Sequence, residues 1–193
     1  MIFTRSFVYF HIPKTGGRWF EKLLVEHAPD DWELDFQPGH WTTTELQEHR
    51  PQHFDKPRIA FVRNPCDAYV SLFFNWKEKG EFPELTTTFE HFVKHLVETG
   101  HTISTWLKNA MSDGVVLLIG RFEQLREDCR VLLQQFEELP AALDQAFQQD
   151  EPVNASRHLP YSMYYDGRLR AVVAAADAAF IEKFGYKFEE RWL

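Results

Sequence analysis

A glycine-rich turn between an apolar segment and a helix-like segment constrains the fold of this chain most strongly. Residues 7–12 are mostly apolar, residues 13–17 read Pro-Lys-Thr-Gly-Gly, and residues 17–27 carry apolar positions at helical spacing. A buried strand that turns into a helix in this way leaves several backbone N–H groups pointing at one spot beside the Lys14 ammonium. The sequence therefore predicts an anion site, suited to phosphate, at the end of this strand.

The turn differs from a Walker A loop. The pattern G-x-x-x-x-G-K-[ST] places its lysine after the glycines and follows it with a hydroxyl that binds magnesium. Here Lys14 precedes both glycines and is followed by Thr15. No His/Cys/Asp group in the sequence has metal-ligand spacing either. We therefore expect a phosphate site that requires no metal.

A second anion site is predicted after the apolar strand at residues 59–62. This strand delivers Arg63 to its end, Pro65 takes the first helical position, and Ser71 follows Arg63 by eight residues. Arginine binds a terminal phosphate through bidentate charge-assisted hydrogen bonds, and a helical serine adds a neutral donor. A nucleotide with phosphates at two ends would use both sites.

These motifs resemble those of the PAPS-dependent sulfotransferases, especially the branch that acts on carbohydrate hydroxyls. In that family, P-K-T-G-G is the 5′-phosphosulfate loop, and R-N-P with a serine eight residues after the arginine is the 3′-phosphate motif. The resemblance implies PAPS (3′-phosphoadenosine 5′-phosphosulfate) as co-substrate. It also implies a nucleotide-binding set of Lys14, Thr15, Gly16, Gly17, Arg18, Trp19, Arg63, Ser71 and Arg157.

Nearly the whole chain takes part in the resemblance. The further matching segments are G-H-W at residues 39–41, R-F-E-Q-L at residues 121–125, N-A-S-R at residues 154–157, Y-Y at residues 164–165 and F-G-Y-x-F at residues 184–188. In the family, the basic residue of the N-x-S-[KR] pattern closes over a phosphate of the nucleotide, which is the role implied for Arg157. The order and spacing of these short motifs carry more weight than any one of them.

The resemblance places the general base at His40 and a catalytic cation at Lys14. An acceptor hydroxyl is a poor nucleophile near neutral pH, and a histidine whose pKa stays near 6.5 is suited to taking its proton. The oxygen then attacks sulfur in line, while Lys14 and the loop N–H groups stabilise charge on the leaving phosphate. Glu21 and Glu33 are the alternative bases.

The chain departs from the family pattern at two places. The family usually has threonine or serine after the two glycines, whereas this chain has Arg18 and Trp19. Arg18 either replaces the lost hydroxyl contacts or reaches the acceptor. After Asp67, where the family often has another arginine, this chain has Ala68 and Tyr69.

Strands alternate with helices along the chain, which implies parallel strand pairing and right-handed crossovers. The expected strands are at residues 7–12, 59–62 and 115–119, and the expected helices at residues 17–27, 65–76, 89–97, 124–136 and 166–185. We expect a three-layer α/β/α sandwich with a central parallel sheet, P-loop-NTPase-like, in a single domain of residues 1–193. Ligands should bind at the carboxyl ends of the strands.

Composition narrows the possible partners. The formal charge of −8 and the lack of a basic stripe argue against nucleic acid as a ligand. No apolar stretch is long enough to span a membrane and no signal-peptide layout is present, so we expect a cytoplasmic protein that does not bind membranes. Two cysteines do not make a disulfide framework.

The sequence thus predicts a sulfotransferase that sulfates an acceptor hydroxyl, on a carbohydrate or a small molecule. Two alternatives share parts of the pattern. A P-loop-like nucleotide kinase would share the fold but needs a lysine after the glycines and a carboxylate for magnesium. A non-catalytic PAP-binding protein would keep Lys14, Arg63 and Ser71 without a competent base.

Overall fold

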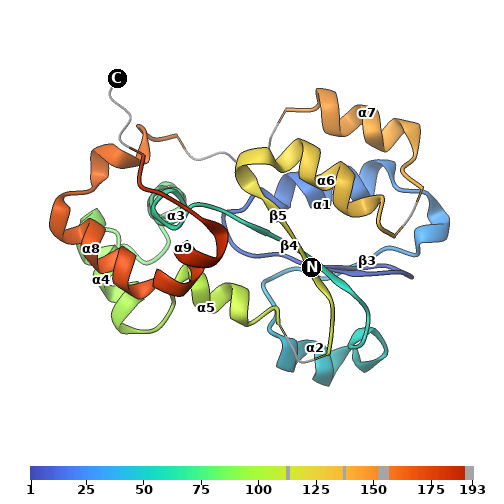
Figure 1. Cartoon of the computed structure of the whole chain (residues 1–193), viewed down its shortest axis with the longest axis horizontal. Coiled ribbons are helices and arrows are strands. Elements are labelled where there is room, and N and C mark those ends of the chain that lie inside the picture. Colours follow the sequence, from blue (N-terminus) through green and yellow to red (C-terminus); the bar gives the residue numbers. More distant parts are fainter. Residues whose placement is uncertain (112–113, 137, 152–156, 190–193) are drawn as a thin grey trace. The chain divides into compact units, whose positions relative to one another are not determined.

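The computed structural model describes residues 1–111, 114–136, 138–151 and 157–189. The chain forms two compact units (Figure 1). The first unit comprises Met1–Val62 and Leu107–Asn154, and the second comprises Arg63–Trp106 and Ala155–Leu193.

The first unit is built on a five-stranded sheet with the strand order β3-β1-β2-β4-β5. The strands are β1 (Ile2–Phe3), β2 (Val8–Phe10), β3 (Asp35–Phe36), β4 (Arg58–Val62) and β5 (Leu117–Arg121). Strand β4 pairs in parallel with both β2 and β5, with Ile59 opposite Tyr9 and Leu118. This parallel part is the predicted central sheet.

Two short antiparallel strands, β1 and β3, extend the sheet. The sequence-based expectation included neither as a separate strand. A tight turn separates β1 from β2, because the Thr4 hydroxyl oxygen accepts the N–H groups of Ser6 and Phe7, at 3.1 and 2.9 Å. A local side-chain bond of this kind competes with strand pairing and reverses the chain.

Helices cover both faces of this sheet, as predicted for three layers. Helices α1 (Gly17–His27), α6 (Leu125–Leu133) and α7 (Ala141–Gln149) lie on one side and α2 (Thr43–His49) on the other (Figure 1). The Phe20 ring of α1 lies 4.7 Å from Tyr9 and 5.2 Å from Phe61, centroid to centroid. These aromatic contacts press the start of α1 onto β2 and β4.

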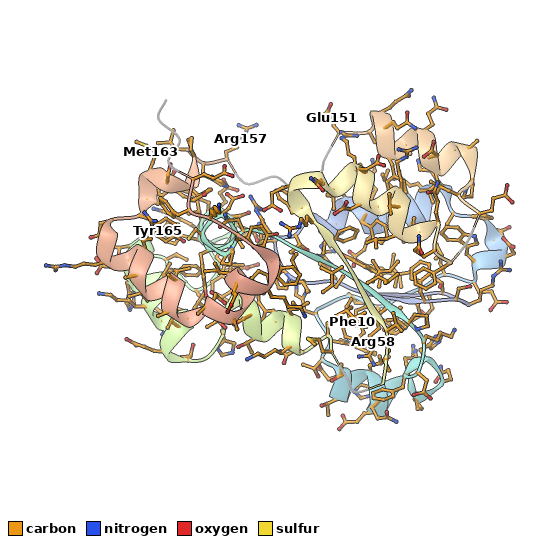
Figure 2. The ribbon with its side chains drawn as sticks, viewed as in Figure 1. Phe10, Arg58, Glu151, Arg157, Met163 and Tyr165 are labelled. Atoms are coloured by element: carbon orange, nitrogen blue, oxygen red, sulfur yellow. The ribbon has the colours of Figure 1, made fainter. Side chains whose placement is uncertain are left out.

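Arg58 places a charged side chain inside the first unit, where it is fully buried next to Phe10 (Figure 2). Its guanidinium donates to the carbonyl oxygens of Ala110 (3.0 Å) and Phe54 (3.1 Å) and lies 5.1 Å from the centre of the Phe10 ring. A buried charge is tolerated only when it is hydrogen-bonded. Arg58 therefore ties two connecting segments to the start of β4.

The second unit is helical in the residues that the structure describes. Its elements are α3 (Pro65–Lys79), α4 (Phe89–Glu98), most of α5 (Ile103–Lys108), η4 (Tyr161–Tyr164), α8 (Gly167–Ala176) and α9 (Ala178–Phe184). The Phe73 ring of α3 packs edge-on against Phe89 and Phe92 of α4, each at 5.5 Å. This aromatic cluster forms the centre of the unit.

One long carboxyl-terminal helix was expected, but the structure has α8 and α9, which are separated at Asp177. The Asp177 carboxylate is fully buried and accepts hydrogen bonds from the Tyr69 hydroxyl (2.9 Å) and the Ser104 N–H (2.7 Å). Burial raises the pKa of this carboxyl above its ordinary value. A buried acid needs such partners, and they fix the chain where the helix breaks.

The remaining elements are the 3₁₀ turns η1 (Asp30–Trp32), η2 (Pro51–His53) and η3 (Phe122–Gln124). The segment of residues 30–55, which lies outside the helices and strands expected from the sequence, contains η1, β3, α2 and η2. Among the described residues, none of the helices combines the length and the apolar character needed to cross a bilayer.

Gly120 of β5 offers a test of this packing. A Cβ at this position would lie 2.6 Å from two carbons of the Phe61 ring and 3.0 Å from Asp128 Cβ. We expect Gly120→Ala to lower the free energy of unfolding by about 1–3 kcal/mol, the usual cost of overpacking a core. The matched control is Gly167→Ala, since that position faces open space. Urea denaturation of both variants makes the comparison, and equal stabilities would contradict the packing of β5 on β4.

Candidate functional site

The Lys14–Gly17 turn follows β2, at the place where the sequence predicts an anion site. Lys14 has φ 63° and Gly16 has φ 80°, so the turn contains two residues in the left-handed region. This conformation is uncommon for a lysine and marks local backbone strain of the kind found at binding sites. The Thr15 hydroxyl donates to the Ile12 carbonyl oxygen at 2.8 Å, which closes the turn.

The backbone conformation favours glycine at residue 16, and the space around the turn requires glycine at both 16 and 17. A Cβ at Gly16 would collide with Leu125, and a Cβ at Gly17 would collide with the Tyr9 hydroxyl and the His11 ring. Helix α1 therefore begins directly against the end of β2. Because the first N–H groups of a helix have no intrahelical partner, this close approach sets them beside the end of β2, where an anion site is predicted.

The two residues that depart from the family pattern have opposite environments. Arg18 is exposed, whereas the Trp19 side chain is buried. The Trp19 ring lies 5.8 Å from the Phe147 ring, centroid to centroid. The backbone N–H of Trp19 donates to the Gly16 carbonyl oxygen at 3.0 Å. Of the two side chains, Arg18 is thus the one that a ligand in solution can reach.

His11 and Glu21 form a buried pair next to this turn. Nδ1 of His11 lies 2.9 Å from Oε1 of Glu21, and the amino nitrogen of Met1 lies 3.3 Å from the same oxygen. Burial alone would raise the pKa of Glu21, but the hydrogen bond and charge of His11, together with the Met1 amino group, outweigh it and lower the pKa. Glu21 is therefore a carboxylate whose protein partners stabilise its charge.

The sequence reasoning did not anticipate this pair, although a signal for it was present. Gly17, Phe20, Glu21 and Leu24 share the helix face that packs on the sheet, so an acidic residue stands in an apolar stripe. A carboxylate there needs a partner. Glu21 was considered as an alternative base, and its burial and its existing partners leave it little access to an acceptor. The other alternative, Glu33, lies exposed in the turn that follows η1.

The His40 side chain is hydrogen-bonded to the backbone of His11. Nδ1 of His40 lies 2.6 Å from the carbonyl oxygen of His11, and the two imidazole rings meet edge to face with centroids 4.7 Å apart. A carbonyl oxygen can only accept a hydrogen bond, so Nδ1 carries the proton. In the neutral ring, Nε2 is then the nitrogen that can take a proton from a substrate.

The pKa of His40 differs from the sequence-based expectation of about 6.5. Although the residue as a whole is exposed, the protein around the ring displaces water from it and thereby lowers the pKa. The charge of His11 lowers it further, so that it falls to about 4, despite the opposing backbone hydrogen bond to His11. His40 is therefore neutral at physiological pH, the protonation state that a general base requires.

In the second unit, Arg63 lies two residues before α3 and Ser71 lies within this helix. The Asn64 side chain caps this helix by accepting the Cys66 N–H at 3.1 Å, and Pro65 takes the first helical position. The Nε and Nη2 atoms of Arg63 each lie 2.8 Å from one carboxylate oxygen of Asp67. Both Arg63 and Ser71 are buried.

The carboxyl-terminal motif is described only in part. Arg157 is exposed at the start of a described segment (Figure 2), whereas Asn154 and Ser156 lie outside the described residues. Tyr165 is half-buried in the second unit, and its hydroxyl donates to the Cys66 carbonyl oxygen at 2.9 Å. Tyr165 therefore holds the first turn of α3, directly after Arg63.

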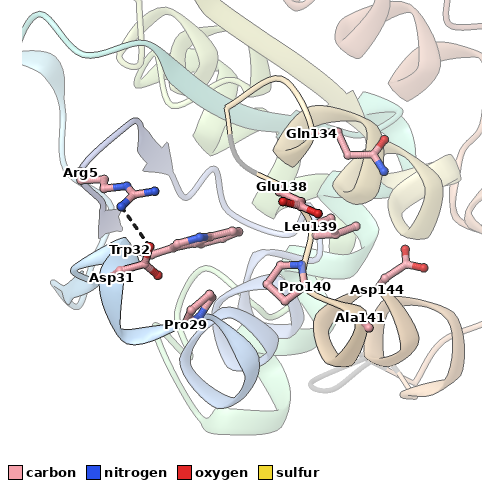
Figure 3. A pocket seen from close by; sticks show the side chains of 10 residues that line it. All are labelled: Arg5, Pro29, Asp31, Trp32, Gln134, Glu138, Leu139, Pro140, Ala141 and Asp144. Carbon is pink, nitrogen blue, oxygen red and sulfur yellow. Dashed lines mark hydrogen bonds and ion pairs between the residues drawn. The ribbon is translucent and has the colours of Figure 1, made fainter.

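A pocket of about 710 Å³ opens at another part of the first unit (Figure 3). Its lining residues are Arg5, Pro29, Asp31, Trp32, Gln134, Glu138, Leu139, Pro140, Ala141 and Asp144. Arg5 lies in the turn that precedes β2, whereas Lys14 follows the end of β2. The pocket is thus at the opposite end of this strand from the predicted anion site.

Glu26, His27 and Asp150 have side chains close enough to share a metal ion, with ligand atoms within 4.8 Å of one another. The Lys22 ammonium already lies 3.6 Å from the Glu26 carboxylate and 3.8 Å from the Asp150 carboxylate. It supplies the cation that these two acids would otherwise attract, so the cluster is an ordinary surface ion-pair network.

Comparison with known proteins identifies the fold. No family model and no curated protein matches the chain. Among solved structures, the crystal structure of mouse sulfotransferase SULT7A1 complexed with PAP is similar, with a TM-score of 0.61 and 15% sequence identity, over 93% of this chain and 83% of that chain. The predicted P-loop-like α/β fold of the sulfotransferases is therefore confirmed.

The protonation state of His40 can be measured directly. We expect the His40 ring in the free protein to titrate with a pKa of about 4, below the ordinary histidine value, and to carry its proton on Nδ1 above that pH. Two-dimensional NMR of ¹⁵N-labelled protein reports both properties, and exposed His101 serves as the internal comparison. A His40 titration near pH 6.5 would contradict the environment described above.

Proposed function

We propose that this protein is a PAPS-dependent sulfotransferase that transfers the sulfuryl group to an acceptor hydroxyl, on a carbohydrate or a small molecule. The observation that carries the proposal is the arrangement of the first unit. The strained Lys14–Gly17 turn opens helix α1, and His40 is bonded to the strand end from which that turn starts. The similarity in fold to a sulfotransferase crystallised with PAP supports the same conclusion.

In this proposal the turn binds the 5′-phosphosulfate. The N–H groups of Thr15, Gly16, Gly17 and Arg18 surround the position where a helix amino terminus favours an anion. Lys14 supplies a full positive charge there. Trp19 supports the loop from the core with its indole ring and by its backbone bond to Gly16.

The second unit would bind the 3′-phosphate. Asp67 fixes one edge of the Arg63 guanidinium, which leaves the planar group in a defined orientation for phosphate. Ser71 lies two helical turns further along α3 and adds a hydroxyl donor. Exposed Arg157 would add a second cation to the same phosphate.

The chemistry needs one proton transfer and one displacement. Nε2 of His40 takes the proton of the acceptor hydroxyl as its oxygen attacks sulfur. The bond between sulfur and the bridging phosphate oxygen breaks, and PAP leaves with the negative charge. Lys14 and the loop N–H groups stabilise this charge as it develops, which is the stage where positioned donors contribute most.

Two other functions would use the same features differently. A nucleotide kinase would turn over ATP with magnesium, and a PAP-binding protein would bind nucleotide without transfer. Lys14 stands before the glycines, which disfavours the kinase, and the tautomer of His40 favours the enzyme over a passive binder. Incubation with ³⁵S-labelled PAPS and an acceptor library, with ATP turnover measured in parallel, separates the three.

Nucleotide selectivity tests the two phosphate sites. PAP should raise the melting temperature clearly more than ATP or ADP, because only PAP offers a 3′-phosphate to Arg63 and Ser71.

The substitution Arg63→Ala should weaken PAP binding by about 2 kcal/mol or more, the scale of a lost charge-assisted bond. Lys94→Ala, which removes an exposed cation of the same unit, is the matched control. Equal stabilisation by ADP and PAP would count against a 3′-phosphate site.

Replacement of the base tests the mechanism. His40→Ala should lower kcat by about 10² to 10⁴, the usual contribution of a positioned general base. PAP affinity, measured by calorimetry, should stay near the wild-type value, since His40 is not among the proposed nucleotide contacts. His101→Ala controls for the loss of an exposed histidine. An active His40→Ala enzyme would remove this residue from the mechanism.

A further inference from the structure

A continuous chain of contacts runs from a carboxylate of α1 to His40. Oε1 of Glu21 accepts the hydrogen bond of His11 Nδ1 at 2.9 Å, and the carbonyl oxygen of the same His11 accepts the bond of His40 Nδ1 at 2.6 Å. Glu21, His11 and His40 all belong to the first unit. Its two ends differ in exposure, because Glu21 is 4% exposed and His40 lies at the surface.

His11 is largely closed off from solvent. It is only 9% exposed, its Nδ1 is bonded to Glu21, and its Nε2 would lie 2.6 Å from a Cβ placed on Gly17. The ring is therefore wedged between Glu21 and the backbone of the anion-binding turn. An imidazole in this position orients other groups and cannot itself reach an acceptor.

Three other groups contact the Glu21–His11–His40 series or lie beside it. Helix α1 contributes Glu21, with exposed Arg18 one turn before it. Strand β2 contributes Tyr9, whose ring stacks on the His11 ring with centroids 6.0 Å apart. The Met1 amino nitrogen donates to Oε1 of Glu21, the same oxygen that His11 contacts. Burial keeps the pKa of Tyr9 well above its ordinary value, so the phenol is neutral. Glu21 is thus the anionic partner of His11 in this cluster.

We propose that Glu21 is a positioning residue that, through His11, holds His40 in the Nδ1–H tautomer with Nε2 available to the acceptor. This inference rests on the proposed role of His40 as the base. Without the Glu21 bond, the buried Nδ1 of His11 loses its acceptor, and the ring must turn to find another. The His11 ring also packs edge to face against the His40 ring, with centroids 4.7 Å apart, so a turned His11 ring would displace His40 from the His11 carbonyl oxygen that selects its tautomer.

Two substitutions separate hydrogen bonding from other effects of Glu21. Glu21→Gln keeps an oxygen that can accept the His11 Nδ1–H bond, whereas Glu21→Leu keeps the approximate volume and removes the acceptor. Loss of a group that orients a functional histidine typically costs about 10- to 100-fold in activity. We expect this loss in the kcat of Glu21→Leu, with the KM for PAPS within about threefold of wild type, and we expect Glu21→Gln to recover most of kcat. Glu26→Gln, on the exposed side of the same helix, is the control.

The tautomer of His40, read from ¹⁵N chemical shifts, is the decisive measurement because it needs no activity. Nδ1–H should predominate in the wild type and in Glu21→Gln, and the two tautomers should mix in Glu21→Leu. A PAP-induced rise in melting temperature verifies that each variant is folded. Wild-type kcat and an unchanged tautomer in Glu21→Leu would overturn the proposal, as would an Nε2–H tautomer in the wild type. If the wild type transfers no sulfate, the proposed function fails while the tautomer measurement still decides this inference.

Discussion

The rest of the first unit depends on the close approach of helix α1 to the end of strand β2. No side chain fits at Gly17, because the Tyr9 hydroxyl and the His11 ring occupy the space that a Cβ would need. This contact brings the helix amino terminus, with its unpaired N–H groups, to the carboxyl end of a strand, where α/β folds bind ligands. The same contact encloses the His11 ring, so the anion site and the support for His40 arise from one packing constraint.

The sequence predicted those parts of the fold in which local pattern and tertiary packing agree. An apolar run predicted strand β4, and a proline at the first helical position predicted the start of helix α3. The alternation of strands with helices predicted the parallel pairing of β2, β4 and β5. Where local pattern and packing diverge, prediction was wrong. Residues 166–185 have helical spacing throughout, yet the buried hydrogen bonds of Asp177 divide them into α8 and α9. Those partners come from α3 and α5, which no local pattern reveals.

At the candidate site, the sequence predicted the positions of motif residues better than their partners. The motif gives Arg63 as a phosphate ligand, and the structure shows this arginine in an ion pair with Asp67. Two guanidinium nitrogens on one carboxylate oxygen fix the plane of the Arg63 side chain, and its role as a phosphate ligand stays a prediction. Trp19 shows the opposite case: its motif position suggested a ligand contact, whereas its side chain serves the core.

If His40 acts as the proposed base, its low pKa places two demands of base catalysis in opposition. A pKa of about 4 keeps the ring neutral and ready to accept a proton, but it also makes the ring a weak base, whereas proton transfer is most efficient when the pKa lies near the working pH. A phosphosulfate bound at the neighbouring turn would add negative charge, which stabilises the imidazolium and raises the pKa. His40 would then become a stronger base when the sulfuryl donor is in place. In that case, burial and, after it, the charge of His11 would suppress the proton affinity of His40 in the free protein, and the bound donor would restore it.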